Sequence, residues 1–141
     1  MGYELRQHTA DVAVEATGQT LGVTFGAAAD GMAAAMCADW PTDGTPDRFT
    51  VDVTAESREA LLFDYLDELI YERDVRLVLP VDNTAQIECV TRSKGGWHLD
   101  GSARGVDLDR VEARDLKAVT YSEMAIEETE TGWRVYVVFD V

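Results

Sequence analysis

Two aspartates near opposite ends of the sequence lie in segments that could combine into a metal site. Asp11 belongs to His8-Thr9-Ala10-Asp11-Val12, and Asp140 is next to last, in Val137-Val138-Phe139-Asp140-Val141. In each predicted strand the aspartate lies on the face opposite the apolar side chains. If the strands are neighbours, both carboxylates converge with the α-carboxylate of Val141. Such a cluster is unfavourable without a cation or a proton, and its hard oxygen ligands suit Mg²⁺, Ca²⁺ or Mn²⁺. Taken alone, two aspartates so far apart in sequence are more simply interpreted as surface acids.

The sequence contains none of the common motifs of a self-contained active site. It has no P-loop, no dinucleotide-binding glycine motif, no nucleophile elbow and no HExxH zinc motif. A nucleophile–base pair would need His8 or His98, and His98, close to Asp100, is interpreted as an ordinary exposed histidine. Cys37 and Cys89 lie in apolar patterns without metal-ligand spacing. We therefore expect both to be reduced core residues rather than a disulfide.

Periodicity predicts the elements that would position the two aspartates. Alternation predicts a short strand over Asp11–Glu15. Thr20 can cap a helix whose apolar residues recur at helical spacing to about residue 37, although Gly22, Gly26 and Gly31 weaken it by up to about 1 kcal/mol each. A second alternating strand over Arg48–Thr54 precedes a strongly amphipathic helix that Ser57 can cap.

The second half of the chain is rich in predicted strands. A buried strand is expected over Val75–Leu79. Two hairpins are expected as well, formed by Ala85–Arg92 with Trp97–Ala103 and by Ala118–Glu127 with Trp133–Val141. Two helices among about seven strands predict an α+β fold for a single domain over residues 1–141. The expected architecture is a two-layer sandwich, with one mixed, largely antiparallel sheet and both helices packed on one face.

The charge balance is strongly acidic. There are 27 acidic against 12 basic residues, a formal net charge of −15, and only Lys94 and Lys117 are lysines. Such a field repels phosphate backbones, so stable direct binding of nucleic acid is not expected. A dispersed, lysine-poor acidic surface favours hydration in concentrated salt and predicts a salt-loving host. No apolar run approaches the roughly 20 residues that span a bilayer, and no signal peptide is recognisable, so we expect no membrane association and a cytoplasmic location.

Four segments, taken in order, make the sequence resemble the archease family, the small accessory proteins of RtcB-type tRNA-splicing RNA ligases. They are His8–Val12, the helical segment Leu61–Tyr71, Lys117–Tyr121 and the terminal Val138–Val141. No single segment is decisive. All four occur in family order and spacing in a chain of family length, and the match covers nearly the whole sequence.

The resemblance implies a non-enzymatic activator of an RNA ligase. Archeases promote attachment of GMP to the ligase's active-site histidine, sustain multiple turnover and can broaden which nucleoside triphosphate the ligase accepts. The family's divalent-metal site maps onto Asp11, Asp140 and the carboxylate of Val141, and its motif lysine maps onto Lys117. The metal would be Ca²⁺, Mg²⁺ or Mn²⁺. Lys117 carries a compact charge suited to a phosphate or carboxylate of the partner or its nucleotide, or it is a surface lysine paired with an acid.

Other functions stay open on the sequence. A small metal-dependent hydrolase of nucleotides or phosphoesters could use the same carboxylates. That alternative is disfavoured because no base or nucleophile is found near them. A general chaperone-like activity is the third hypothesis, and the sequence favours no particular oligomeric state.

Overall fold

Strands make up most of the molecule, and two long helices interrupt them. The structure, a computed structural model, describes residues 2–7, 11–41, 47–90 and 96–141. In chain order its elements are β1 (Gly2–Gln7), β2 (Asp11–Gly18), α1 (Leu21–Met36), β3 (Arg48–Ala55), α2 (Arg58–Arg76), β4 (Val78–Val90), β5 (Gly96–Asp107), the short 3₁₀ helix η1 (Leu108–Arg110), β6 (Ala118–Thr129) and β7 (Gly132–Asp140).

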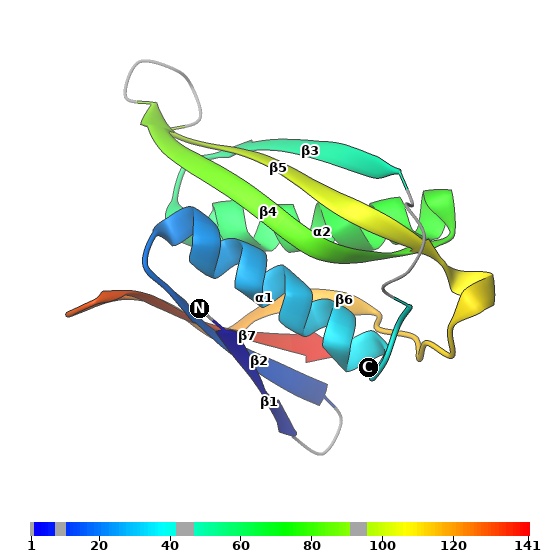
Figure 1. Cartoon of the computed structure of the whole chain (residues 1–141). Helices are drawn as coiled ribbons and strands as arrows, with labels where there is room; N and C mark the ends of the chain where they lie inside the picture. The colour runs from blue at the N-terminus through cyan, green and yellow to red at the C-terminus, as the bar shows by residue number, and fades with distance from the viewer. Residues whose placement is uncertain (1, 8–10, 42–46, 91–95) are drawn as a thin grey trace.

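The strands form two antiparallel sheets. The first sheet has the order β1-β2-β7-β6 and the second the order β3-β5-β4. The first sheet therefore joins strands from the two ends of the described chain, whereas the second is built from its middle. Figure 1 shows the first sheet at the bottom of the view and the second at the top.

Both helices lie between the two sheets. Helix α1 packs on β4 of the second sheet and on β1, β2 and β7 of the first, while α2 contacts β3, β4 and β5 on one side and β6 on the other (Figure 1). The α+β class and the antiparallel character are thus confirmed, and each sheet carries the helices on one of its faces. The expected single sheet is instead two sheets, because periodicity predicts strands but not which distant strands pair.

Helix α1 is suited to this middle layer. Thr20 caps it by accepting a hydrogen bond from the Val23 amide at 3.1 Å, as predicted. Most of its side chains are small or apolar and are buried on nearly every side, as expected of a helix with protein on two faces. Its glycines permit close packing. A Cβ on Gly22 would collide with the carbonyl oxygen of Ala85 in β4, and one on Gly26 would lie 3.0 Å from that of Asn83.

Helix α2 is amphipathic, as predicted, and Ser57 caps it by accepting from the Ala60 amide at 3.1 Å. Its apolar stripe is buried, with Tyr65, Leu66 and Leu69 fully enclosed. The expected strand over Val75–Leu79 is wrong at its start. The helix continues to Arg76, Leu77 adopts a left-handed conformation with φ of 57°, and β4 begins only at Val78.

Both predicted hairpins are confirmed, as β4–β5 and β6–β7. Strand β4 is longer than expected, because a bulge between Val81 and Thr84 lets one continuous strand follow the second sheet. Both cysteines are free, and Cys37 is buried. Cys89 is exposed, so its assignment to the core is wrong. In the described part of the chain, no helix is long and apolar enough to cross a membrane.

Candidate functional site

Asp11 and Asp140 are direct partners across two neighbouring strands. Asp11 begins β2 and is paired in register with Asp140, which ends β7. Directly opposed residues of an antiparallel pair project from the same face of the sheet. Asp11 is half-buried, with its Oδ1 atom enclosed, and Asp140 is exposed. The expectation that the strands bearing these two aspartates are neighbours is therefore confirmed.

Lys117 lies at the same end of the first sheet. Its main-chain N–H donates a hydrogen bond to the Asp140 carbonyl oxygen at 2.9 Å. The next residue, Ala118, begins β6 and is paired in register with Asp140 from the side opposite Asp11. The backbone of Asp140 is thus held between the strand that begins at Asp11 and the segment that contains Lys117. The side chain of Lys117 is exposed.

Arg73 anchors the segment that leads to Lys117, and the sequence analysis missed it. This arginine of α2 is 8% exposed and is one of the few charged or polar side chains buried in the described part of the chain. Its Nη1 donates to the carbonyl oxygen of Leu116 at 3.1 Å. Its Nη2 is paired with Asp74 at 2.9 Å and with Asp115 at 3.6 Å. The side chain of Leu116 is fully buried, so the residue before Lys117 is fixed by its carbonyl and its side chain.

The end of α1 holds the same segment through Arg114. The backbone N–H of Arg114 donates to the Met36 carbonyl and its Nε to the Ala35 carbonyl, both at 2.7 Å. The last carbonyls of a helix lack partners within the helix and attract cations. Arg114 supplies both hydrogen-bond donors and a positive charge to these carbonyls at the end of α1. A basic residue shortly before a motif is the only sequence signal that could have indicated this anchor.

The donors at this end of the first sheet fit a hard divalent cation. Among the described residues, no three His, Cys, Asp or Glu side chains form a group that could hold a metal ion. A site here would combine the Asp11 and Asp140 carboxylates, which are register partners, with further oxygen donors. Oxygen donors of this kind suit Ca²⁺, Mg²⁺ or Mn²⁺ rather than softer metals.

His98 lies away from this group. His98 lies on the second sheet, where its Nε2 is 2.9 Å from Asp52 Oδ1 and its Nδ1 is 3.5 Å from Glu88 Oε1. The hydrogen bond to Asp52 raises the pKa of His98 above its ordinary value. His8, together with Thr9 and Ala10 of the first motif, falls outside the described residues.

Sequence comparison identifies the class of protein. Residues 3–141 match the model of the Archease protein family (MTH1598/TM1083). The chain is 32% identical to the protein archease of Methanosarcina mazei over 99% of its own length and 95% of that protein. It is 35% identical to the protein archease of Aeropyrum pernix over 99% and 97% of the two chains.

Solved structures share the fold. The solution structure of Methanobacterium thermoautotrophicum protein 1598 is similar with a TM-score of 0.83 and 29% identity, over 99% of each chain. A crystal structure from Thermotoga maritima, described as an archease and possible chaperone, has a TM-score of 0.62 and 20% identity, over 98% of this chain and 96% of that one. The fold thus defines an α+β protein in which two antiparallel sheets enclose a layer of helices. The chain belongs to the archease family.

Proposed function

We propose that this protein is an accessory activator of an RtcB-type tRNA-splicing RNA ligase. In this proposal it acts on the ligase's own chemistry, promoting guanylylation of the ligase, sustaining multiple turnover and broadening the nucleoside triphosphates that the ligase uses. The protein is not itself an enzyme. Family membership supports the proposal, since all four motif segments belong to one chain that matches the family from residue 3 to residue 141.

The observation that carries the proposal is the pairing of Asp11 with Asp140. Two residues 129 positions apart are register partners at the end of one sheet, and the backbone of Lys117 is bonded to one of them. Like charges directly opposed across strands are unfavourable unless something compensates them. A divalent cation held by Asp11, Asp140 and the carboxylate of Val141 would provide that compensation.

The bound cation would supply positive charge able to orient and partly neutralise phosphate groups. The chain's own residues have simpler roles in this proposal. The two aspartates bind the cation, and the pairing of β2 with β7 fixes their mutual position. The backbone bond from Lys117 to Asp140 places Lys117 beside them, and its exposed ammonium contacts the partner or its nucleotide. The described residues near the aspartates include no paired nucleophile and base, which favours activation over hydrolysis.

The test is a multiple-turnover RNA-joining assay with GTP at catalytic ligase concentration. Asp11→Asn and Asp140→Asn keep the side-chain size and remove one charge each. Either change should abolish stimulation and weaken Mn²⁺ binding measured by calorimetry, while the ligase's own first turnover stays unchanged. Lys117→Ala should impair stimulation but leave Mn²⁺ affinity intact. Asp67→Asn, an exposed acid on α2, is the matched control and should behave as the parent.

Two results would redirect the proposal. A double Asp11→Asn/Asp140→Asn variant that is folded, does not bind Mn²⁺ and still stimulates joining would exclude the metal-centred mechanism. GTP hydrolysis by the purified chain with Mn²⁺ alone would favour the hydrolase alternative.

Adding residues after Val141 tests the third donor, because the carboxylate becomes an amide carbonyl. Mn²⁺ affinity should then fall, and an unchanged affinity would remove Val141 from the site.

A further inference from the structure

Strand β1 forms one edge of the first sheet. The sheet has the order β1-β2-β7-β6, so β2 is the only described strand that pairs with β1. Figure 1 shows β1 as the outermost strand of this sheet. An edge strand presents a row of backbone N–H and C=O groups with which another strand can pair, and proteins usually protect such edges.

The other edge strands of the described sheets are protected in ways that β1 is not. Strand β6 is irregular between Thr120 and Ala125, and β4 is interrupted by a bulge between Val81 and Thr84. The apolar side chains of β3 are already buried, and this strand contacts α2. Strand β1, by contrast, pairs with β2 in unbroken register over all six of its residues and contains no proline. Its outer edge is therefore regular enough to accept a further strand.

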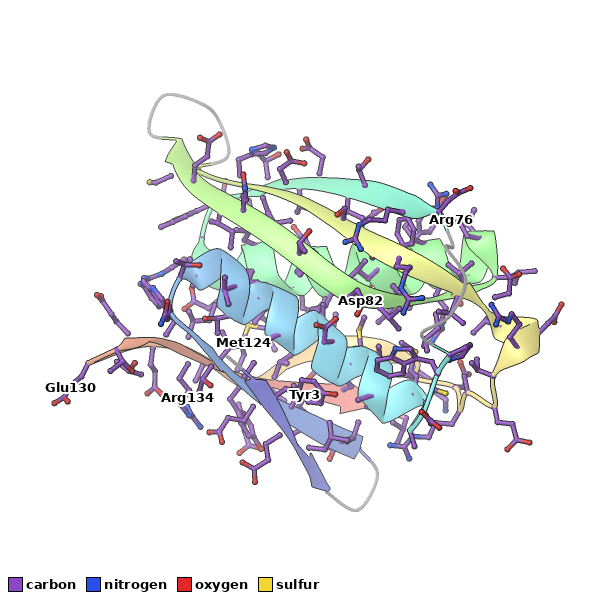
Figure 2. All side chains as sticks on the ribbon, in the orientation of Figure 1. Tyr3, Arg76, Asp82, Met124, Glu130 and Arg134 are labelled. Carbon is purple, nitrogen blue, oxygen red and sulfur yellow. The ribbon has the colours of Figure 1, made fainter. Side chains whose placement is uncertain are left out.

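Strand β1 also exposes two apolar side chains. Tyr3 and Leu5 are each 42% exposed, although their register partners Ala16 and Val14 are fully buried. Tyr3 lies on the face of the sheet that carries α1, since a Cβ on Gly31 would be 3.1 Å from the Tyr3 Cβ. Figure 2 shows Tyr3 at β1, next to α1. The parts of these two side chains that α1 leaves uncovered are available to a neighbour at the sheet edge.

An apolar groove lies next to Leu5. It has a volume of about 320 Å³, and its lining includes Leu5, Val12 of β2 and residues 34–36 at the end of α1. Its two charged lining residues, Glu112 and Arg114, are opposite in sign. The volume is at the lower end of the range of small-molecule pockets, so one large side chain can fill the groove. The lining favours a side chain that is uncharged and largely apolar.

We propose that a second copy of this chain pairs with this edge, in an antiparallel β1–β1 pair whose two-fold axis passes through Leu5. The two four-stranded sheets then form one continuous sheet. Leu5 lies opposite its own copy, and Tyr3 lies opposite position 7 of the other copy. Position 7 is the register partner of Val12, and opposed residues share a face. Tyr3 of each copy therefore lies in line with Val12 of the other, where it can fill the groove.

Charge selects this register among the antiparallel alternatives. The next registers on either side are centred on Glu4 and on Arg6. They would place two glutamates or two arginines directly opposite each other, which is destabilising. In the register centred on Leu5, position 4 of one copy lies opposite position 6 of the other, so an acid faces a base. The sequence of β1 is thus complementary to itself when it pairs antiparallel.

The charge of β1 also favours a second copy at this edge over contacts elsewhere on the chain. Residues 2–7 contain one acid and one base, whereas the whole chain has a net charge of −15 and β4 and β6 contain acids without a base. Two copies therefore repel each other over most of their surface but not along β1. The interface consists of one strand pair and a few side chains, so the dimer should be transient, and salt should favour it. The proposal does not depend on ligase activation.

The association is tested first on the unmodified chain in molar KCl. Sedimentation equilibrium at increasing protein concentration should show a reversible equilibrium between one chain and two. In ¹H–¹⁵N spectra over the same concentrations, the amides of Tyr3 and Leu5 should shift, whereas that of Thr50 on the β3 edge should stay in place. A mass that remains that of one chain up to about 1 mM protein would overturn the proposal. A dimer whose formation shifts no amide of β1 would overturn it too, because the interface would then be elsewhere.

A cysteine at the two-fold axis tests the register. Leu5→Cys is combined with Cys89→Ser, which removes the exposed native thiol. Mild oxidation should give a disulfide-linked dimer, because the Cα atoms of directly opposed residues are about 4.5–5.5 Å apart. Gly2→Cys in the same background is the matched control. The proposed pairing separates this cysteine from its copy by six residues, about 20 Å, so it should cross-link far more slowly. Equal rates for the two variants would contradict the register.

Two further variants test the side chains. Leu5→Lys removes the central apolar contact and places two ammonium groups opposite each other, and Tyr3→Ala empties both grooves. Each should raise the Kd of the dimer by about tenfold or more. Tyr71→Ala, which removes a 58% exposed tyrosine of α2, is the matched control and should leave the Kd unchanged. An unchanged Kd in Leu5→Lys, or an equal rise in Tyr71→Ala, would overturn the proposal. The mass and spectra of the unmodified chain test it whether or not a variant folds.

Discussion

The guanidinium group of Arg73 donates to the main-chain oxygen of Leu116, with Nη1 and O 3.1 Å apart. This bond joins the last turns of α2 to the residue that precedes Lys117. The same Nη1 lies 3.1 Å from the Met36 sulfur at the end of α1. One buried arginine therefore joins both helices to the segment that enters the candidate site.

Replacing Arg73 should destabilise the protein more than replacing a surface arginine. Arg73→Met keeps much of the aliphatic bulk but leaves the enclosed Leu116 carbonyl without this donor, which costs about 1–3 kcal/mol. Arg134→Met is the matched control, since surface ion pairs such as those of Arg134 contribute roughly 0–1 kcal/mol. Urea unfolding measures both free energies. An equal decrease in the free energy of unfolding of both variants would show that Arg73 contributes no more to stability than a surface arginine.

Gly22→Ala should lower stability, although alanine is the better helix former. In an exposed helix the change would stabilise by about 1 kcal/mol. Here the added Cβ would collide with the Ala85 carbonyl, which belongs to the β4 backbone and cannot rotate away. Overpacking of this kind costs about 1–3 kcal/mol. Thermal unfolding of Gly22→Ala and of Gly2→Ala provides the comparison, because a Cβ on Gly2 meets nothing within 4 Å. An unchanged or higher melting temperature for Gly22→Ala would contradict tight packing of α1 on β4.

His98 should make stability depend on pH. Its hydrogen bond to Asp52 raises its pKa in the folded state above the ordinary value of 6.5. Folding therefore favours the protonated form of His98. Its contribution to stability is fully present at pH values below the ordinary pKa and is lost as the pH rises through the raised pKa of the folded state. Asp52→Asn should bring the His98 pKa back towards 6.5 and flatten this pH dependence.

The measurement is an NMR titration of the histidine ring protons, combined with unfolding at several pH values. The chain has two histidines, so His8→Gln assigns the His98 resonance. A His98 pKa at or below the ordinary value in the parent protein would contradict the contact with Asp52.

Stability should rise with salt concentration. The net charge of −15 repels itself, and acids are crowded on α2, where burial and the neighbouring Asp67 raise the pKa of Asp64. The Debye length falls from about 10 Å at 0.1 M to about 3 Å at 1 M, so molar KCl screens these repulsions. The melting temperature should therefore be higher in molar KCl than at about 0.1 M. Equal values would contradict the prediction of a salt-adapted surface.

Local signals predicted much of the fold. Thr20 and Ser57 were recognisable as caps because a hydroxyl before an apolar periodic run is typical of a helix start. Both hairpins followed from alternation broken by turn residues. The helix end near Val75 was missed, because Leu77 takes a left-handed conformation that glycine normally adopts.

Pairings between distant residues were harder to predict. The pairing of Asp11 with Asp140 was expected only if their two strands are neighbours. No local sequence signal determines whether these strands pair. The bonds of Arg73 to the Leu116 carbonyl and of Arg114 to the Ala35 carbonyl gave no signal either, because each joins residues far apart in the sequence. The division into two sheets was missed for the same reason.

The pairing of β2 with β7 also has a consequence for the order of folding during synthesis. Strands β3 to β5 and helix α2 are complete once residue 107 has emerged from the ribosome. The centre of the first sheet, by contrast, needs residues 132–140 to return to a strand made more than a hundred residues earlier. Contacts this distant in sequence form late, and the apolar face of β2 stays without its central neighbour until then. The nascent chain is thus most vulnerable to aggregation in the interval before its last strand is translated.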